Sequence, residues 1–146
     1  MRNPRSQNRT GWIALALLLA IASTAAVVSA QEAGVDQLVE KGRVSYLAHC
    51  ASCHGREGQG LKALYPALTD SAYLGDRIGE LPCLISSGVR GKIVTGKRTK
   101  NIRMPAFADL SIEQMNSLIS YLQLNWGKGG ETVSEQKINQ WLRSCP

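Results

Sequence analysis

Apolar residues recur at steps of three and four near the start of the polar part of the chain, which is typical of a helix that buries one face. Over residues 35–47, the positions that share this face are Val35, Leu38, Val39, Gly42 and Tyr46. The pattern predicts a helix that runs directly into the stretch AHCASCHG, residues 48–55.

A second apolar stripe follows a helix-start signal. Ser111 and Gln114 have the spacing of a capping box, in which each side chain bonds the other residue's backbone. The stripe consists of Ile112, Met115, Leu118, Ile119 and Leu122. We therefore expect a helix from about 111 to 125, ended by Gly127, and a short final helix over residues 134–143.

Between these helices the pattern is weaker. Residues 55–62 are rich in glycine and predict a loop, and residues 69–88 predict short helical pieces ended by Gly88. Residues 89–103 predict a basic loop that leaves room for a short hairpin around Gly96. No long strand alternation and no repeat is visible, so the predicted fold class is all-α.

The N-terminus has the features of an export signal. Three arginines precede an apolar run over residues 12–28, which ends in small residues. We expect a signal peptide at 1–30, cut after Ala30, then a domain at 31–127 and an extension at 128–146. The alternative is an uncleaved anchor, although the run is shorter than the ~20 residues that span a bilayer; membrane contact is expected only in that case.

Export changes how the cysteines and charges are interpreted. In an oxidising compartment, spare cysteines usually pair, which favours a disulfide between Cys83 and Cys145. Free thiols, or a bond to a partner subunit or lipid, stay open as alternatives. Three of the 17 basic residues and none of the 11 acidic ones precede Ala30, so the exported part is only modestly basic.

The order C-x-x-C-H at Cys50, Cys53 and His54 is the attachment signal of c-type haem. Two thiols add to the haem vinyl groups, and the adjacent histidine supplies a nitrogen ligand to the iron. A redox dithiol would need a strand–helix–strand context, and a zinc site would need better-placed further ligands. A chance match is the remaining alternative. His49 is expected at the surface or beside the haem propionates.

Around this motif the chain resembles the monohaem class I cytochromes c, in particular bacterial periplasmic ones, over about residues 35–126. Met104, in the sequence Met-Pro-Ala-Phe, resembles the family's second iron ligand. Pro66 lies 12 residues after His54, where the family places the carbonyl that accepts the imidazole hydrogen bond. The resemblance also implies that Gly42 and Tyr46 pack across the last family helix, with Leu118 and Tyr121 as candidates there.

The resemblance implies a small fold of helices wrapped around one covalent haem c, with an extra C-terminal helix. A histidine and a methionine would make the iron six-coordinate, which suits single-electron transfer without substrate turnover. The implied location is the periplasm.

A basic run precedes Met104. Between residues 81 and 108 there are six basic and no acidic side chains: Arg90, Lys92, Lys97, Arg98, Lys100 and Arg103. We expect this basic loop to dock an acidic redox partner. Nucleic acid is a poor alternative, because no aromatic residue lies inside the run.

An electron-transfer protein of this kind could have two roles, and the protein is expected to be a monomer or a subunit of a complex. The first is a carrier from a quinol-oxidising complex or dehydrogenase to a terminal oxidase. The second is a fixed subunit of a periplasmic dehydrogenase complex, for alcohol or sulfur-compound oxidation. A haem sensor or peroxidase would require Met104 to leave the iron.

Overall fold

A computed structural model describes residues 33–61, 64–95 and 98–146. The predicted signal peptide at 1–30 lies outside these residues. The chain divides into two compact units, Met1–Asp36 and Gln37–Pro146. Of the first unit, residues 33–36 are described and are helical. In the described residues no helix combines the length and apolar character that crossing a membrane requires.

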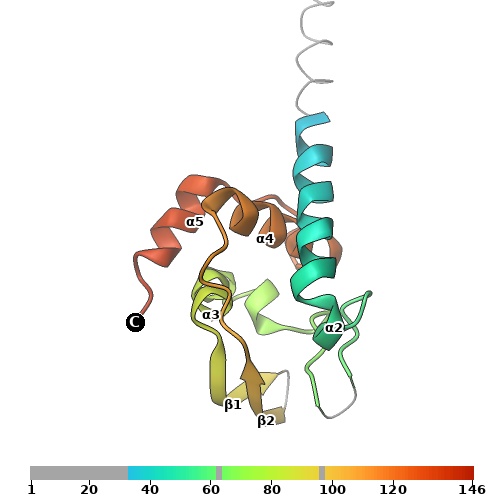
Figure 1. Cartoon of the computed structure of the whole chain (residues 1–146), viewed down its shortest axis with the longest axis vertical. Helices are drawn as coiled ribbons and strands as arrows, with labels where there is room; N and C mark the ends of the chain where they lie inside the picture. The colour runs from blue at the N-terminus through green and yellow to red at the C-terminus, as the bar shows by residue number, and fades with distance from the viewer. Residues whose placement is uncertain (1–32, 62–63, 96–97) are drawn as a thin grey trace, which may run out of the picture. The chain divides into compact units, whose positions relative to one another are not determined.

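Helices and short helical turns are the main regular elements of the second unit (Figure 1). The first helix, here called the N-terminal helix, covers residues 33–49. The later elements are α2 (Ala51–His54), η1 (Ala72–Leu74), η2 (Ile78–Glu80), α3 (Leu81–Ser87), β1 (Val89–Thr95), β2 (Arg98–Met104), α4 (Ile112–Trp126) and α5 (Glu135–Leu142). The all-α fold class predicted from the sequence is confirmed.

The helix-start signals act as the sequence predicts. The Ser111 hydroxyl accepts a hydrogen bond from Gln114 N at 3.2 Å, and the Gln114 side chain accepts one from Ser111 N at 2.9 Å. Ser134 caps α5 by accepting a bond from Lys137 N at 3.3 Å. Both helices therefore begin where their capping side chains replace missing intrahelical partners.

The basic run contains a pair of strands, as the hairpin option that the sequence left open predicts. Strands β1 and β2 pair antiparallel, from Val89 opposite Met104 to Thr95 opposite Arg98. This small sheet is an addition to a mainly helical domain, so the all-α fold class stands. The strands carry several β-branched residues, which favour extended backbone.

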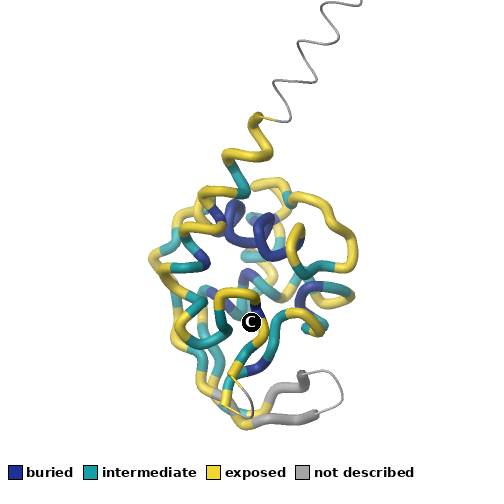
Figure 2. The backbone as a smooth tube through the Cα atoms, turned by 90° about the vertical axis from the view of Figure 1, so that its right-hand side faces the viewer, coloured by how far each residue is buried: buried dark blue, intermediate teal, exposed yellow. Residues whose placement is uncertain are grey.

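Helix α4 supplies most of the core. Its side chains from Met115 to Gln123 are all buried, and Tyr46 of the N-terminal helix is fully buried against them. The rings of Tyr46 and Tyr121 lie 5.6 Å apart, and Trp126 lies 5.2 Å from Tyr46. In Figure 2 these buried positions, dark blue, are surrounded by half-buried and exposed chain.

The N-terminal helix crosses α4 at Gly42. A Cβ atom added there would overlap the Ser117 carbonyl oxygen and lie 2.6 Å from Tyr121 Cβ. The expected contact with Tyr121 is thus present, and the backbone of Ser117 also lies directly against the glycine. Leu118, the other candidate on this helix, is buried in the core, at 1% exposure.

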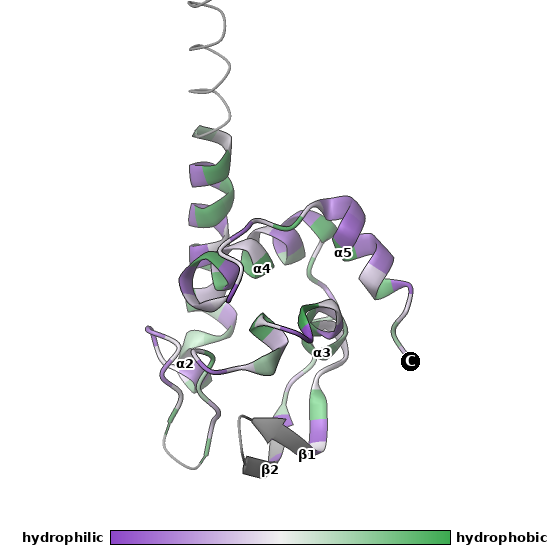
Figure 3. Ribbon diagram, turned by 180° about the vertical axis from the view of Figure 1, so that it is seen from behind, coloured by the Kyte–Doolittle hydropathy of each residue, from purple (hydrophilic) through white to green (hydrophobic). Residues whose placement is uncertain are grey.

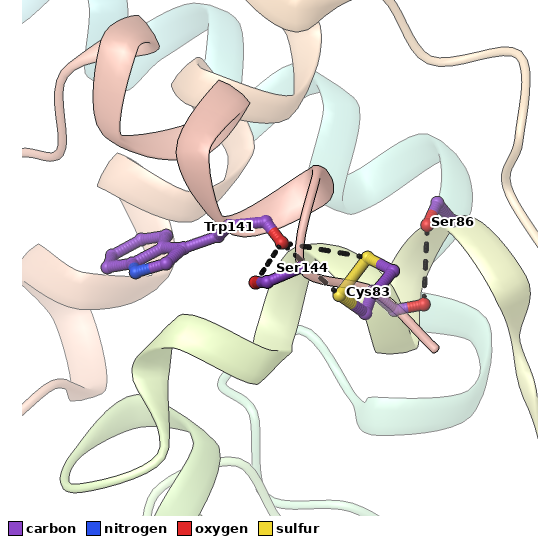
Figure 4. The surroundings of a disulfide bond; sticks show 5 residues. Cys83, Ser86, Trp141 and Ser144 are labelled. Carbon is purple, nitrogen blue, oxygen red and sulfur yellow. Dashed lines mark hydrogen bonds between the residues drawn. A yellow bond between two sulfur atoms is a disulfide. The ribbon is translucent and has the colours of Figure 1, made fainter.

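Residues 128–146, here called the C-terminal extension, pack against this core. The sulfurs of Cys83 and Cys145 form a disulfide, which confirms the predicted pairing (Figure 4). Figure 3 shows α5 as mostly hydrophilic, and its one fully buried side chain is Ile138.

Candidate haem site

The C-x-x-C-H motif lies where the N-terminal helix gives way to the single turn of α2. Cys50 precedes this turn, and its carbonyl accepts hydrogen bonds from Cys53 N at 3.1 Å and His54 N at 2.9 Å. Gly55 ends the turn with a φ of +80°, a conformation that glycine adopts without strain. One helical turn therefore holds both thiols and the imidazole beside the same cavity.

This cavity brings together all five site residues expected from the sequence: Cys50, Cys53, His54, Pro66 and Met104. The cavity has a volume of about 110 Å³ and is partly open to solvent. The other walls are mainly apolar and come from several elements, including Leu68, Tyr73, Leu81, Leu84 and Phe107. Among the described residues that line the cavity, Arg103 is the only one of the strongly charged types Lys, Arg, Asp and Glu.

His54 is fixed in one orientation by a backbone carbonyl. Its Nδ1 lies 2.9 Å from Pro66 O, and because a carbonyl can only accept, Nδ1 must carry the proton. Burial lowers the pKa of His54, and the bond to the Pro66 carbonyl opposes this only partly. The imidazole is therefore held neutral, with Nε2 free of a proton, which is the form that binds iron.

The two thiols do not have the properties of a redox dithiol. Both Cys50 and Cys53 are unpaired. Burial, and secondarily the nearby Cys53, raise the pKa of the Cys50 thiol to about 12. Reactive C-x-x-C dithiols instead have lowered thiol pKa values. In the described part of the chain, no three His, Cys, Asp or Glu side chains gather where they could hold a metal ion.

Met104 reaches the cavity from the end of β2. Its backbone pairs with Val89, and its side chain is half-buried in the cavity wall. Met115, by contrast, is 2% exposed in the core of α4 and is not part of the wall. The structure thus brings Met104, and not Met115, into the same cavity as His54.

These donors fit a c-type haem: two thiols three residues apart, a neutral imidazole, a thioether and an apolar cavity. The walls from η1 and α3 were not expected from the sequence, although the apolar residues Leu81 and Leu84 three apart were a usable signal. His49, which was expected at the surface or beside the haem propionates, is exposed and also lines this cavity, where its ring lies 5.5 Å from Phe107.

Tyr46 contacts the residue that directly follows the C-x-x-C-H motif. Its hydroxyl donates a hydrogen bond to the carbonyl of Gly55, and burial raises the pKa of this tyrosine. The tyrosine was expected only as a helix-packing residue. It therefore links the helix crossing to the end of the haem-attachment turn.

Fold and site together define a cytochrome c domain. The family described as cytochrome c oxidase, cbb3-type, subunit III matches residues 37–122, which is more than half of the chain. The chain belongs to this family. Membership implies a covalently bound haem c and a role in electron transfer. A comparison with curated proteins gave no match.

Proposed function

We propose that the chain transfers single electrons through one haem c, attached through Cys50 and Cys53, with His54 and Met104 as iron ligands. The single C-x-x-C-H motif in the sequence supports one haem. The observation that carries the proposal is the shared cavity, in which His54 is hydrogen-bonded to Pro66 O and Met104 belongs to the same wall.

The haem supplies the one-electron chemistry, and the protein controls its environment. The Pro66 carbonyl holds the imidazole in one orientation and strengthens it as a ligand. A thioether ligand favours ferrous iron and raises the reduction potential. The apolar side chains of Leu68, Leu81 and Leu84 make the surroundings of the haem less polar than water. With His54 and Met104 both bound to the iron, no coordination position is left for a substrate.

Met104→Ala tests the ligand set directly. We expect the variant to retain covalent haem, to have a lower reduction potential and to bind carbon monoxide when reduced. The comparison is with the unmodified protein, which we expect to exclude carbon monoxide. A variant that keeps the spectrum of methionine ligation would refute the assignment of Met104.

We also propose an exported location and a protein partner. The Cys83–Cys145 disulfide supports an oxidising compartment such as the periplasm. The family description names a subunit of an oxidase, which supports a terminal oxidase as the electron acceptor. It also supports the fixed-subunit arrangement of the second role, although the complex that the description names is an oxidase and not a dehydrogenase. Co-purification with a stoichiometric catalytic subunit would favour the fixed role.

The partner should dock near β1 and β2. Arg90, Lys92 and Arg103 are exposed there, and Arg103 also belongs to the cavity wall. A positive surface beside the cavity would attract an acidic partner and accelerate transient association.

A charge-reversal experiment tests this docking surface. We expect Arg90→Glu with Lys92→Glu to slow electron transfer to an acidic partner roughly tenfold at low salt, with the difference shrinking as salt screens it. The control is Lys137→Glu with Arg143→Glu, which reverses two exposed charges on the C-terminal extension. Equal rates for the two double variants at every ionic strength would eliminate the docking proposal.

A further inference from the structure

The C-terminal extension is bound to α4 by specific contacts, not only by its chain connection. The backbone of Val133 lies between two buried polar side chains of α4. Asn116 donates a side-chain hydrogen bond to Val133 O, and Ser120 Oγ accepts one from Val133 N at 3.3 Å. Ile138 of α5 is fully buried in the core. The start of α5 therefore has a defined place on the core.

The far end of the extension is bound to α3 and η2. The disulfide joins Cys145 to Cys83 in the first half of α3. The Trp141 indole lies over Gly79, so closely that a Cβ atom added there would be 3.0 Å from its Nε1. Ser144 Oγ donates to Trp141 O at 2.7 Å and helps to close the last turn (Figure 4).

Helix α3 in turn contacts both the haem cavity and the Met104 segment. Leu81 and Leu84 are part of the cavity wall. Ile85 O, two residues beyond Cys83, accepts a hydrogen bond from Phe107 N at 2.9 Å. At the end of α3, a Cβ atom added to Gly88 would lie 2.6 Å from Met104 O. The disulfide is therefore joined to the backbone of Met104 through one short helix.

We infer that the Cys83–Cys145 disulfide and Trp141 position Met104 for iron binding, an inference that rests on the proposed function. Met104 lies at the end of a two-stranded hairpin, and such hairpins are only marginally stable alone. The contacts of α3 with Phe107 and Met104 fix the end of the hairpin. The C-terminal extension fixes α3 in turn, through the disulfide. Loss of the disulfide increases the fraction of molecules in which Met104 has left the iron.

The test measures how readily an external ligand takes the sixth position. The matured haem protein is prepared unmodified and as Cys83→Ser with Cys145→Ser, and imidazole is titrated into the ferric form. We expect covalent haem in both, and roughly tenfold tighter apparent imidazole binding in the variant, because apparent affinity scales with the fraction of open molecules. Trp141→Ala, with the disulfide intact, should shift binding in the same direction and remains informative if the cysteine variant fails to fold.

Two controls separate the possible failures. Ile119→Val removes a methylene from a fully buried core side chain of α4 and reports the effect of a general loss of stability. If it tightens imidazole binding as much as the cysteine variant does, or if neither the cysteine variant nor Trp141→Ala changes binding, the positioning role is wrong. If the unmodified protein already binds imidazole as tightly as Met104→Ala, Met104 is not a ligand and the proposed function itself fails.

Discussion

The substitution Gly42→Ala tests whether the N-terminal helix and α4 cross as closely as the structure shows. The new Cβ atom would overlap the Ser117 carbonyl oxygen and lie 2.6 Å from Tyr121 Cβ. Carbon atoms in good contact are ~3.5–4.0 Å apart. One of the two contacting atoms is backbone, so rotation of a side chain cannot relieve the overlap and the helices must separate.

The magnitude follows from two opposing effects. Overpacking a close contact typically costs 1–3 kcal/mol, and we take about 3 because a backbone atom is involved. Alanine gains about 1 kcal/mol over glycine from helix propensity. The free energy of unfolding should therefore fall by about 2 kcal/mol, equivalent to a decrease in Tm on the order of 10 °C.

The assay is thermal and denaturant unfolding of the matured protein, followed by circular dichroism, at equal haem content. Gly34→Ala is the matched control, because it makes the same change in the same helix and a Cβ atom there has nothing within 4 Å. It should leave Tm unchanged or raise it slightly. If the two variants have equal stability, the close crossing at Gly42 is wrong.

Two further predictions concern haem attachment and the C-terminal extension. Cys50→Ala with Cys53→Ala should abolish covalent haem, seen as loss of haem staining in a denaturing gel; staining that persists would mean another attachment site. Ile138→Ala should lower the free energy of unfolding by about 2–5 kcal/mol, because it empties a fully buried position in α5. An unchanged denaturant midpoint would show that the extension is not packed on the domain.

Much of the fold could be predicted because the helices carry local signals. The stripe of α4 and its capping box lie in neighbouring residues, and Ser111 and Gln114 mark the start of the helix without reference to the rest of the chain. The attachment motif was predictable for a similar reason, because Cys50, Cys53 and His54 lie within one turn. Pro66 and Met104 were predicted from the family resemblance instead, and the structure places both at the same cavity.

Other features depend on contacts between distant residues. The hairpin of β1 and β2 has short strands with many charged positions, so its alternation is weak and pairing decides its structure. Adjacent helix residues point about 100° apart, so which residue of α4 lies against Gly42, here Ser117, depends on how the two helices cross. Nothing in the local sequence indicated that α3 would join the disulfide to the Met104 segment.

An optical spectrum of the matured protein shows whether the haem is closed, with His54 and Met104 as iron ligands. The spectrum is recorded oxidised, then reduced, then reduced under carbon monoxide. For a closed haem we expect low-spin spectra, the ferric charge-transfer band of methionine ligation, and no change on adding carbon monoxide. A high-spin spectrum, or a shift under carbon monoxide, would mean that the iron is open and that Met104 does not bind it.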